Sequence, residues 1–240
     1  VVFQSNFRGS TGHGRADTFA SNGDYGNGRV QQDIVEGVRW LLGQGIGDAR
    51  RVGIVGHSFG GYSTLQGLTF QPELFKIGVA GAPPSDLGWG MRWLVQSGDQ
   101  GDLPDRSLKH TLAALSLDAT DPATYARLHA QSPQANAMKM RRPLLIMAGG
   151  ADRTVAIRDV IHYSATLKSL GRAVTLLVEP GGGHSPVDPV PREAYLFVME
   201  TMLQRHLGGP VPEAPGQRLR AYLRENLRLA GPEFAGFAKK

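Results

Sequence analysis

The fold is decided by a short stretch in the first quarter of the chain, Val52-Gly53-Ile54-Val55-Gly56-His57-Ser58-Phe59-Gly60-Gly61. Its apolar start predicts a buried strand, and the glycines that follow predict a tight turn into a helix. In such a G-x-S-x-G turn, small residues at Gly56 and Gly60 let strand and helix approach while the serine hydroxyl stays exposed. The pattern makes Ser58 a candidate nucleophile, although an ordinary strand-to-helix turn has the same composition.

Two further predicted strands are followed by the residues that such a serine needs. A hydroxyl requires a base at neutral pH, and the base requires an orienting carboxylate. Residues 143–148 predict a buried strand followed by Asp152, and residues 174–178 predict another, followed by His184 in a glycine-rich loop. The order Ser58, Asp152, His184 is that of α/β-hydrolases, whose sites lie at the carboxyl ends of parallel strands. We therefore predict an α/β-hydrolase fold with a mostly parallel sheet flanked by helices.

Each candidate partner has an alternative role. Asp152 fits equally well as a cap for a helix that starts near Thr154. His57 should point away from the exposed hydroxyl and support the packing. The remaining histidines lack the required setting in the sequence; they are His13, His110, His129, His162 and His206.

Four segments resemble the catalytic domain of the prolyl oligopeptidase family of serine peptidases, including its dipeptidyl-peptidase and acylaminoacyl-peptidase branches. They are residues 6–14, 33–42, 51–62 and 143–185. An N-x-R-G-S-x-G-x-G motif followed by a G-x-S-x-G-G-Y elbow is fairly specific to that family. The resemblance runs through residues 1–207 and implies that Ser58 is the nucleophile, Asp152 the orienting acid and His184 the general base. The elbow departs slightly from the family's usual aromatic pair, since His57 and Phe59 stand where Trp and Tyr are frequent.

The beginning of the sequence predicts further structure upstream. Val1-Val2-Phe3 reads as a strand, whereas hydrolases of this fold place several strands and an oxyanion-hole loop before this point. We therefore expect the C-terminal part of a longer protein, without the first strands of the fold. The resemblance also implies a large upstream β-propeller that limits substrate size. The oxyanion donor that remains visible is the backbone N–H of Phe59.

The stretch from Asp86 to about Gln134 breaks the alternation of strands and helices and predicts a cover or pocket wall. It holds Trp89 and Trp93 at the place where the related peptidases build an aromatic pocket for the residue before the scissile bond. We predict that Phe59, Trp89 and Trp93 line this pocket. Because Trp89 and Trp93 are four residues apart, packing on one helix face fits them equally well.

Two other motif residues are expected to be structural. Arg8 in the N-x-R-G-S motif should pair with a carboxylate rather than touch substrate, since a half-buried guanidinium needs a fixed partner. Tyr62, on the helix after the elbow, should pack beneath the nucleophile. The sequence also predicts a helix over residues 33–42 and a strand over residues 77–82.

Residues 208–240 are predicted to form a linker and a basic amphipathic helix over 218–230. They carry six Lys or Arg against three Asp or Glu, whereas the whole chain has a net charge of +5. Without interleaved aromatic residues this charge does not indicate nucleic-acid binding. We expect the apolar face to pack on the missing N-terminal region or on a second subunit of a homo-oligomer, rather than on a membrane.

Length and composition limit the remaining possibilities. A chain of 240 residues can bury one substantial core, and no stretch approaches the roughly 20 apolar residues of a membrane span. We expect a soluble protein, and zero cysteines leave cytoplasm and periplasm both open. No metal-ligand spacing or phosphate-binding loop indicates a cofactor or a metal. The prediction is a serine peptidase acting on short peptides, with a carboxylesterase and a catalytically silent binding fragment as alternatives.

Overall fold

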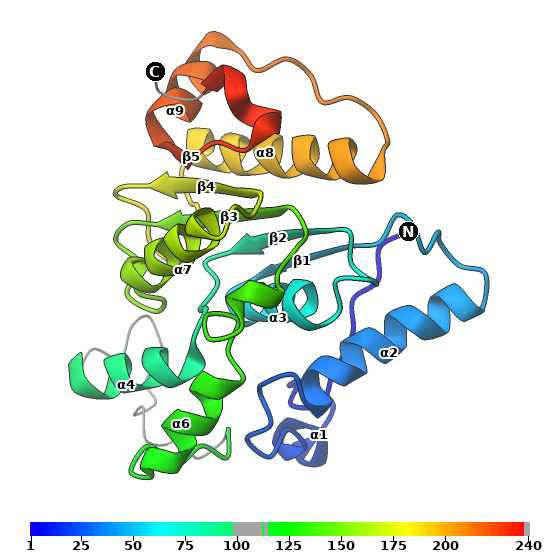
Figure 1. Cartoon of the computed structure of the whole chain (residues 1–240), viewed down its shortest axis with the longest axis vertical. Coiled ribbons are helices and arrows are strands. Elements are labelled where there is room, and N and C mark those ends of the chain that lie inside the picture. The colour runs from blue at the N-terminus through cyan, green and yellow to red at the C-terminus, as the bar shows by residue number, and fades with distance from the viewer. Residues whose placement is uncertain (98–111, 113–114, 238–240) are drawn as a thin grey trace.

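The computed structural model describes residues 1–97, 112 and 115–237 (Figure 1). Its centre is a five-stranded sheet in the order β1-β2-β3-β4-β5. Four strands run parallel: β1 (Gly53–His57), β2 (Ile77–Gly81), β3 (Leu144–Gly149) and β4 (Val174–Glu179). The last strand, β5 (Leu227–Leu229), pairs with β4 in the antiparallel direction. The mostly parallel sheet flanked by helices is therefore confirmed.

Helices cover both faces of this sheet, which is why its strands read as nearly continuous apolar runs. On one face lie α2 (Arg29–Gly43), α3 (Phe59–Phe70) and α7 (Ile157–Ser169). On the other lie α8 (Pro189–Leu207) and α9 (Gln217–Asn226), at the top of Figure 1. Alternate residues of each strand enter opposite cores, so Leu144 packs toward α7 and Leu145 toward α8.

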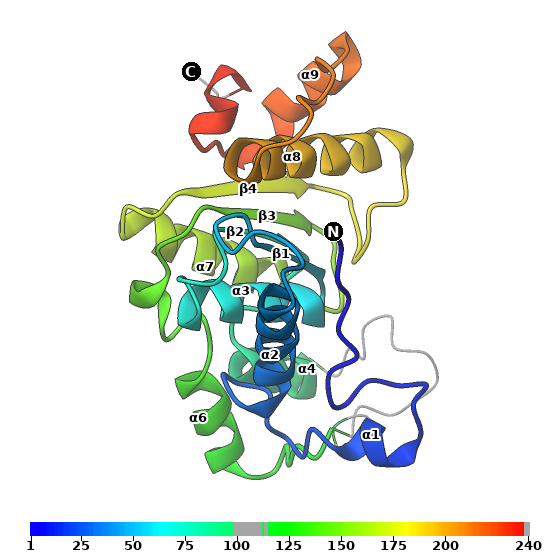
Figure 2. The same ribbon diagram turned by 90° about the vertical axis from the view of Figure 1, so that its right-hand side faces the viewer.

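A third group of helices extends from the carboxyl ends of the strands. It comprises α1 (Arg15–Phe19), α4 (Leu87–Ser97) and α6 (Pro122–Ala130), which both views place far from α8 (Figure 2). Met91 of α4 and Leu128 of α6 share a small core with Tyr25. Short 3-10 turns follow at η1 (Ala137–Lys139) and η2 (Pro232–Phe237). Residues 98–111 and 113–114 of the expected pocket wall lie outside the described residues.

The strand predicted at the start of the chain is not formed. Residues 1–3 have no regular secondary structure, and Val1 and Val2 are 99% and 98% exposed. A strand is stable only where neighbouring strands and a core satisfy its backbone and cover its side chains. The apolar composition of this segment favours a strand, but no described strand pairs with it.

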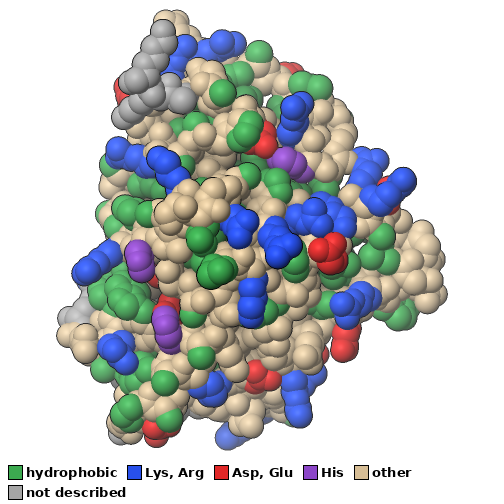
Figure 3. Space-filling view, viewed as in Figure 1, with side chains coloured by type: hydrophobic (Ala, Val, Ile, Leu, Met, Phe, Trp, Pro, Cys, Tyr) green, Lys and Arg blue, Asp and Glu red, His purple; other side chains and the backbone are tan. Residues whose placement is uncertain are grey.

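The C-terminal segment packs on its own chain, which corrects the expectation that it packs on another region or subunit. The predicted helix 218–230 ends at Asn226 and is followed by β5 on the edge of β4. Leu219 and Leu223 of α9 are buried against α8 and β4. Figure 3 shows Lys and Arg side chains spread over the whole face viewed in Figure 1, so positive charge is not confined to this segment. Within the described parts of the chain, no helix is long and apolar enough to cross a membrane.

Candidate active site

Ser58 stands at a sharp turn between β1 and α3. Its backbone has φ 56° and ψ −118°, a left-handed conformation that costs a non-glycine residue energy. The Ser58 N–H donates to the Gly81 carbonyl at 2.8 Å, which ties the turn to β2. A Cβ at Gly56 would overlap the carbonyl group of Gly60, whereas a Cβ at Gly60 would meet no atom within 4 Å. Close approach of strand and helix therefore depends on Gly56, and the expectation for a small side chain at Gly60 is wrong.

Asp152 and His184 meet at the ends of β3 and β4. His184 Nδ1 lies 2.8 Å from Asp152 Oδ2, with the two side chains 21% and 2% exposed. The other carboxylate oxygen, Oδ1, accepts the backbone N–H groups of Thr154 and Val155 at 2.8 and 2.9 Å. Asp152 thus bonds the imidazole of His184 and also caps a turn, although this is a loop turn and not the start of α7, which begins only at Ile157. Its catalytic role stays a prediction.

The charge of Asp152 is held by these hydrogen bonds. Burial raises the pKa of the Asp152 carboxyl, but the hydrogen bonds from His184, Val155 and Thr154 outweigh it, so the pKa lies below its ordinary value. An ionised Asp152 favours a proton on Nδ1 of His184. The Nε2 atom of that imidazole is then left without a proton and can act as a base.

Backbone contacts hold the two loops together. The Gly150 N–H donates to the Glu179 carbonyl at 2.7 Å, and the Ala151 N–H donates to the Gly182 carbonyl at 2.9 Å. A Cβ at Gly149 would overlap the Gly182 and Gly183 carbonyl groups. The close contact of the loops that carry Asp152 and His184 therefore depends on Gly149, whereas a Cβ at Gly183 would meet no atom within 4 Å.

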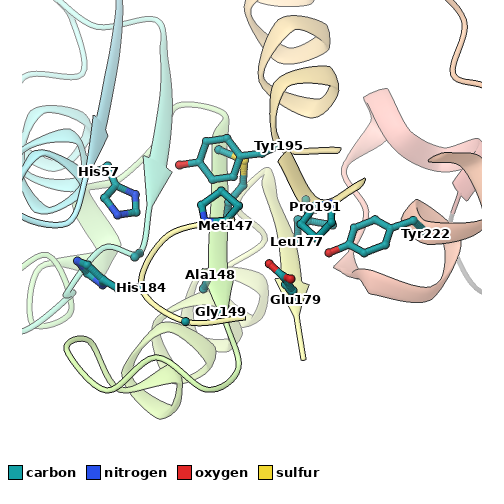
Figure 4. Close-up of a pocket in the computed structure, with 13 residues that line it drawn as sticks. His57, Met147, Ala148, Gly149, Leu177, Glu179, His184, Pro191, Tyr195 and Tyr222 are labelled. Atoms are coloured by element: carbon teal, nitrogen blue, oxygen red, sulfur yellow. The ribbon is translucent and has the colours of Figure 1, made fainter. Parts of the chain in front are cut away.

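His57 packs against His184, a contact that the sequence did not indicate. The two ring centroids are 5.0 Å apart at an interplanar angle of 61° (Figure 4). Burial, and then the neighbouring His184, lower the pKa of His57, so this ring is neutral at neutral pH. Because His57 directly precedes Ser58, the contact places the imidazole of His184 beside the elbow. His57 is thus a packing residue, as expected, and the group that it packs against is the imidazole of the candidate base His184.

A small cavity of about 30 Å³ lies behind His184. It is lined by side chains from β3, β4, α8 and α9, among them Met147, Glu179, Tyr195 and Tyr222 (Figure 4). This volume suits one or two water-sized groups and not an amino-acid side chain. Tyr222 belongs to the C-terminal segment, so that segment reaches the surroundings of the candidate base.

The aromatic residues predicted as one pocket lie in two different settings. The Phe59 ring contacts Phe7 and Tyr25, each at a centroid distance of 5.7 Å. Trp89 and Trp93 instead stack on each other along α4, with centroids 6.3 Å apart and planes 5° from parallel. The stacking supports the alternative of packing on one helix face, and the pocket role of all three residues stays a prediction. Phe7 precedes the motif arginine, and neither its contact nor that of Tyr25 was expected.

Trp89 also lines a larger groove between α4, α6 and α7, with a volume of about 1050 Å³. At the floor of this groove, Asp159 accepts hydrogen bonds from both the N–H and the hydroxyl of Ser85 at 2.6 Å. Burial raises the pKa of the Asp159 carboxyl to about 6, although these hydrogen bonds favour its ionised form. Asp86 pairs with His129 nearby. These groups join the three helices and lie apart from His184.

The two motif residues expected to be structural behave as predicted. The Arg8 guanidinium forms a bidentate pair with Asp33 of α2, with N–O distances of 2.8 and 2.7 Å. That hydrogen bonding holds the pKa of the Asp33 carboxyl below its ordinary value despite partial burial. Tyr62 is buried, and its hydroxyl accepts a hydrogen bond from Gln66 at 2.6 Å.

Comparison with known proteins shows the family of this chain. Residues 1–202 match the family model described as the prolyl oligopeptidase family. The chain is 33% identical over 247 residues to dipeptidyl peptidase family member 6 of Caenorhabditis elegans, covering 98% of this chain and 32% of that protein. It is 33% identical over 209 residues to dipeptidyl aminopeptidase BIII of Pseudoxanthomonas mexicana, covering 87% of this chain and 29% of that one.

A solved structure shows the same fold. The acylaminoacyl peptidase of Pyrococcus horikoshii superposes with a TM-score of 0.71 at 23% identity, over 91% of this chain and 33% of that one. The chain thus spans about a third of the length of these relatives. It belongs to the prolyl oligopeptidase family, as a peptidase domain.

Proposed function

We propose that this domain is a serine peptidase that hydrolyses short peptides through Ser58, His184 and Asp152. The observation that carries the proposal is the buried Asp152–His184 pair beside the strained turn at Ser58. The names of the relatives, a dipeptidyl aminopeptidase and an acylaminoacyl peptidase, supply the substrate class.

The reaction follows from the positions of the protons. His184 Nε2 takes the hydroxyl proton of Ser58 as Ser58 Oγ attacks the peptide carbonyl, and the ionised Asp152 stabilises the imidazolium that forms. His184 then returns the proton to the leaving amine as the C–N bond breaks, which leaves an acyl-enzyme on Ser58. Water attacks this ester with His184 again as the base, and Ser58 is regenerated.

Phe59 is proposed to act through two of its groups. As the first residue of α3 its backbone N–H has no acceptor within the helix, and in this proposal it donates to the oxyanion that develops on the substrate. One such donor contributes about 2.7–4 kcal/mol to transition-state stabilisation in related chemistry. Its ring, together with Phe7 and Tyr25, offers an apolar surface for the residue before the scissile bond.

Labelling with a fluorophosphonate probe tests the nucleophile. We expect the chain, or any longer protein that contains it, to be labelled and the label to disappear in Ser58→Ala. Ser185→Ala is the matched control, because the Ser185 hydroxyl lies near the site, 3.3 Å from His57 Nε2. Labelling that persists in Ser58→Ala would contradict the assignment.

Substrate class is tested by kinetics on matched peptide anilides and aryl esters. A peptidase cleaves both, whereas a carboxylesterase of the same fold cleaves only the esters at a useful rate. Absence of labelling in both chain lengths, together with salt-sensitive capture of a partner, would favour the catalytically silent binding fragment.

A further inference from the structure

A pocket of about 460 Å³ lies at the amino end of β4, beside the edge strand β5. Val174, the first residue of β4, is part of its lining, whereas His184 follows the carboxyl end of the same strand. β4 has six residues, so a strand length of roughly 20 Å at 3.3 Å per residue separates the pocket from the loop of His184. The pocket is therefore distinct from the candidate active site.

Three cationic side chains from separate elements line this pocket. They are Lys168 in the last turn of α7, Arg172 in the turn before β4, and Arg228 in the middle of β5. No Asp or Glu is among the described residues of the lining. Glu233, on the adjoining turn η2, pairs with His206 at 2.7 Å. The pocket thus gathers positive charge without a carboxylate in its described lining to neutralise it.

The ordinary structural roles of these cations leave their charge available. Within residues 1–97, 112 and 115–237, Lys168 and Arg228 have no hydrogen-bonding or ionic partner. Arg172 donates from Nη2 to the Met138 carbonyl at 2.8 Å, and its buried Nε has no acceptor in the described part of the chain. A helix C-terminus favours a cation such as Lys168, and an edge strand commonly carries a charge such as Arg228. Neither role explains why three cations meet in one pocket.

The pocket lies at one end of a basic edge of the sheet. Each parallel strand begins one or two residues after a cation. In the order β1 to β4, these cations are Arg51, Lys76, Arg142 and Arg172. Arg51, Lys76 and Arg172 donate to backbone carbonyls, which leave their positive charge in place, and Arg142 also pairs with Glu73 at 3.5 Å. A row of like charges raises the local concentration of anions, so this edge favours their entry into the pocket.

The remaining wall of the pocket is largely apolar. Leu227 and Leu229 of β5 contribute to it, together with Val174 and Pro232. A volume of about 460 Å³ falls within the roughly 300–1,000 Å³ of small-molecule sites, which combine apolar walls with a few polar groups. The pocket is thus large enough for an anion that carries an organic part.

We propose that this pocket binds an organic phosphate monoester, with its phosphate among Lys168, Arg172 and Arg228 and its organic part against the apolar wall. Guanidinium groups match phosphate oxygens in a bidentate arrangement, and an ammonium adds a compact charge. A phosphate monoester carries a charge of about −1.5 to −2 at pH 7, so three cations suit it better than they suit a single carboxylate.

Isothermal titration calorimetry with phenyl phosphate tests the site, in this chain or any longer protein that contains it. We expect saturable binding with a Kd below about 1 mM. Benzoate has the same ring and one negative charge, and it should bind at least roughly tenfold more weakly. Inorganic phosphate should also bind more weakly, because it leaves the apolar wall uncovered. Absence of saturable binding, or equal affinity for either of these two ions, would overturn the proposal.

Matched variants locate the binding. Arg228→Gln and Lys168→Gln each remove one cation at an exposed position, so they should keep the melting temperature and weaken phenyl phosphate binding by about tenfold or more. Arg218→Gln removes the same charge from an exposed position on α9 outside the lining, and it should bind within about twofold of the unmodified protein. An equal loss in all three variants would show a general effect of charge and overturn the site. Ser58→Ala should bind as the unmodified protein does, which keeps this test independent of the peptidase proposal.

Vesicles distinguish the two sources of such a phosphate. The comparison is between phosphatidylcholine vesicles with and without phosphatidic acid, whose headgroup is a phosphate monoester. Sedimentation with the phosphatidic acid vesicles that phenyl phosphate reverses would identify a lipid headgroup as the source. Binding of phenyl phosphate without sedimentation would identify a soluble ester. Sedimentation that Arg228→Gln and phenyl phosphate both leave unchanged would count against the pocket as the phosphate site.

Discussion

Asp152→Asn separates the proposed catalytic role of this residue from its structural role, because the backbone N–H groups of the loop fix the orientation of the new side-chain amide. Asp152 Oδ1 accepts the N–H groups of Thr154 and Val155, and Oδ2 faces Nδ1 of His184. An asparagine keeps its oxygen toward the two backbone donors and turns its NH₂ group toward His184. That group donates a hydrogen bond, so Nδ1 must accept it, and the imidazole proton moves to Nε2. The base then holds a proton where it should receive one.

The expected loss can be given a size. In a triad that is forced into the wrong tautomer, kcat falls by about 10⁴-fold, or roughly 5.4 kcal/mol at 1.36 kcal/mol per tenfold. Stability should change little, because both backbone hydrogen bonds survive. Asp152→Ala instead leaves two N–H groups in a buried turn without their acceptor, at about 1–3 kcal/mol each. The alanine variant should therefore lose both activity and stability.

Three measurements check this reasoning. The second-order rate of fluorophosphonate labelling reports the reactivity of Ser58, thermal melting reports the fold, and ¹⁵N chemical shifts of His184 report the tautomer whether or not the chain is active. Labelling of Asp152→Asn within tenfold of the unmodified protein would refute the tautomer argument. So would a loss of stability in the asparagine variant as large as that in the alanine variant.

Gly56→Ala should destabilise the protein by roughly 3 kcal/mol or prevent folding, since its Cβ overlaps Gly60, whereas Gly60→Ala places its Cβ in open space and should melt near the unmodified protein. The pKa of Asp159 is about 6 in the folded protein and 3.8 for an unperturbed carboxyl, so the folded state binds this proton more tightly. The contribution of the protonated group to stability is therefore full below pH 3.8 and is lost as the pH rises through 6. Asp159→Asn should remove this dependence, and a melting profile across pH 3–8 that keeps it would count against the assignment. Leu223→Ala should lower the free energy of unfolding, measured by urea titration, by about 2–5 kcal/mol, because Leu223 is buried. Arg224→Ala, at the exposed neighbouring position, should leave it unchanged, and equal effects of the two variants would show that α9 does not share the core.

Much of the frame could be predicted because its signals are local. Strands buried on both faces leave continuous apolar runs, so β2, β3 and β4 were found within one or two residues of their bounds. The order of Ser58, Asp152 and His184 after three such strands was sufficient to predict that Asp152 and His184 meet. Loops that follow the carboxyl ends of neighbouring parallel strands lie close together, regardless of the sequence between the strands.

What could not be predicted depends on contacts between distant segments. Tyr25 and Phe7 reach Phe59 across regions without a common motif, and an aromatic residue carries no sign of which ring it will meet. The apolar face of α9 indicates that this helix packs against another element. Amphipathicity does not tell whether that element is α8 of the same chain, as the structure has it, or another subunit. At Val1 a local preference for a strand was outweighed by the lack of a paired neighbour.

The docking of α9 and β5 also determines how the molecule would respond to a protease. The connection over residues 208–216 is mostly exposed and has no regular secondary structure, so it is the natural place for a cut. The segment beyond it is held by buried leucines and by pairing with β4. A chain nicked there should run as two bands in a denaturing gel and as one particle in native chromatography. The two pieces would behave as a non-covalent complex that still closes the cavity behind His184 with Tyr222.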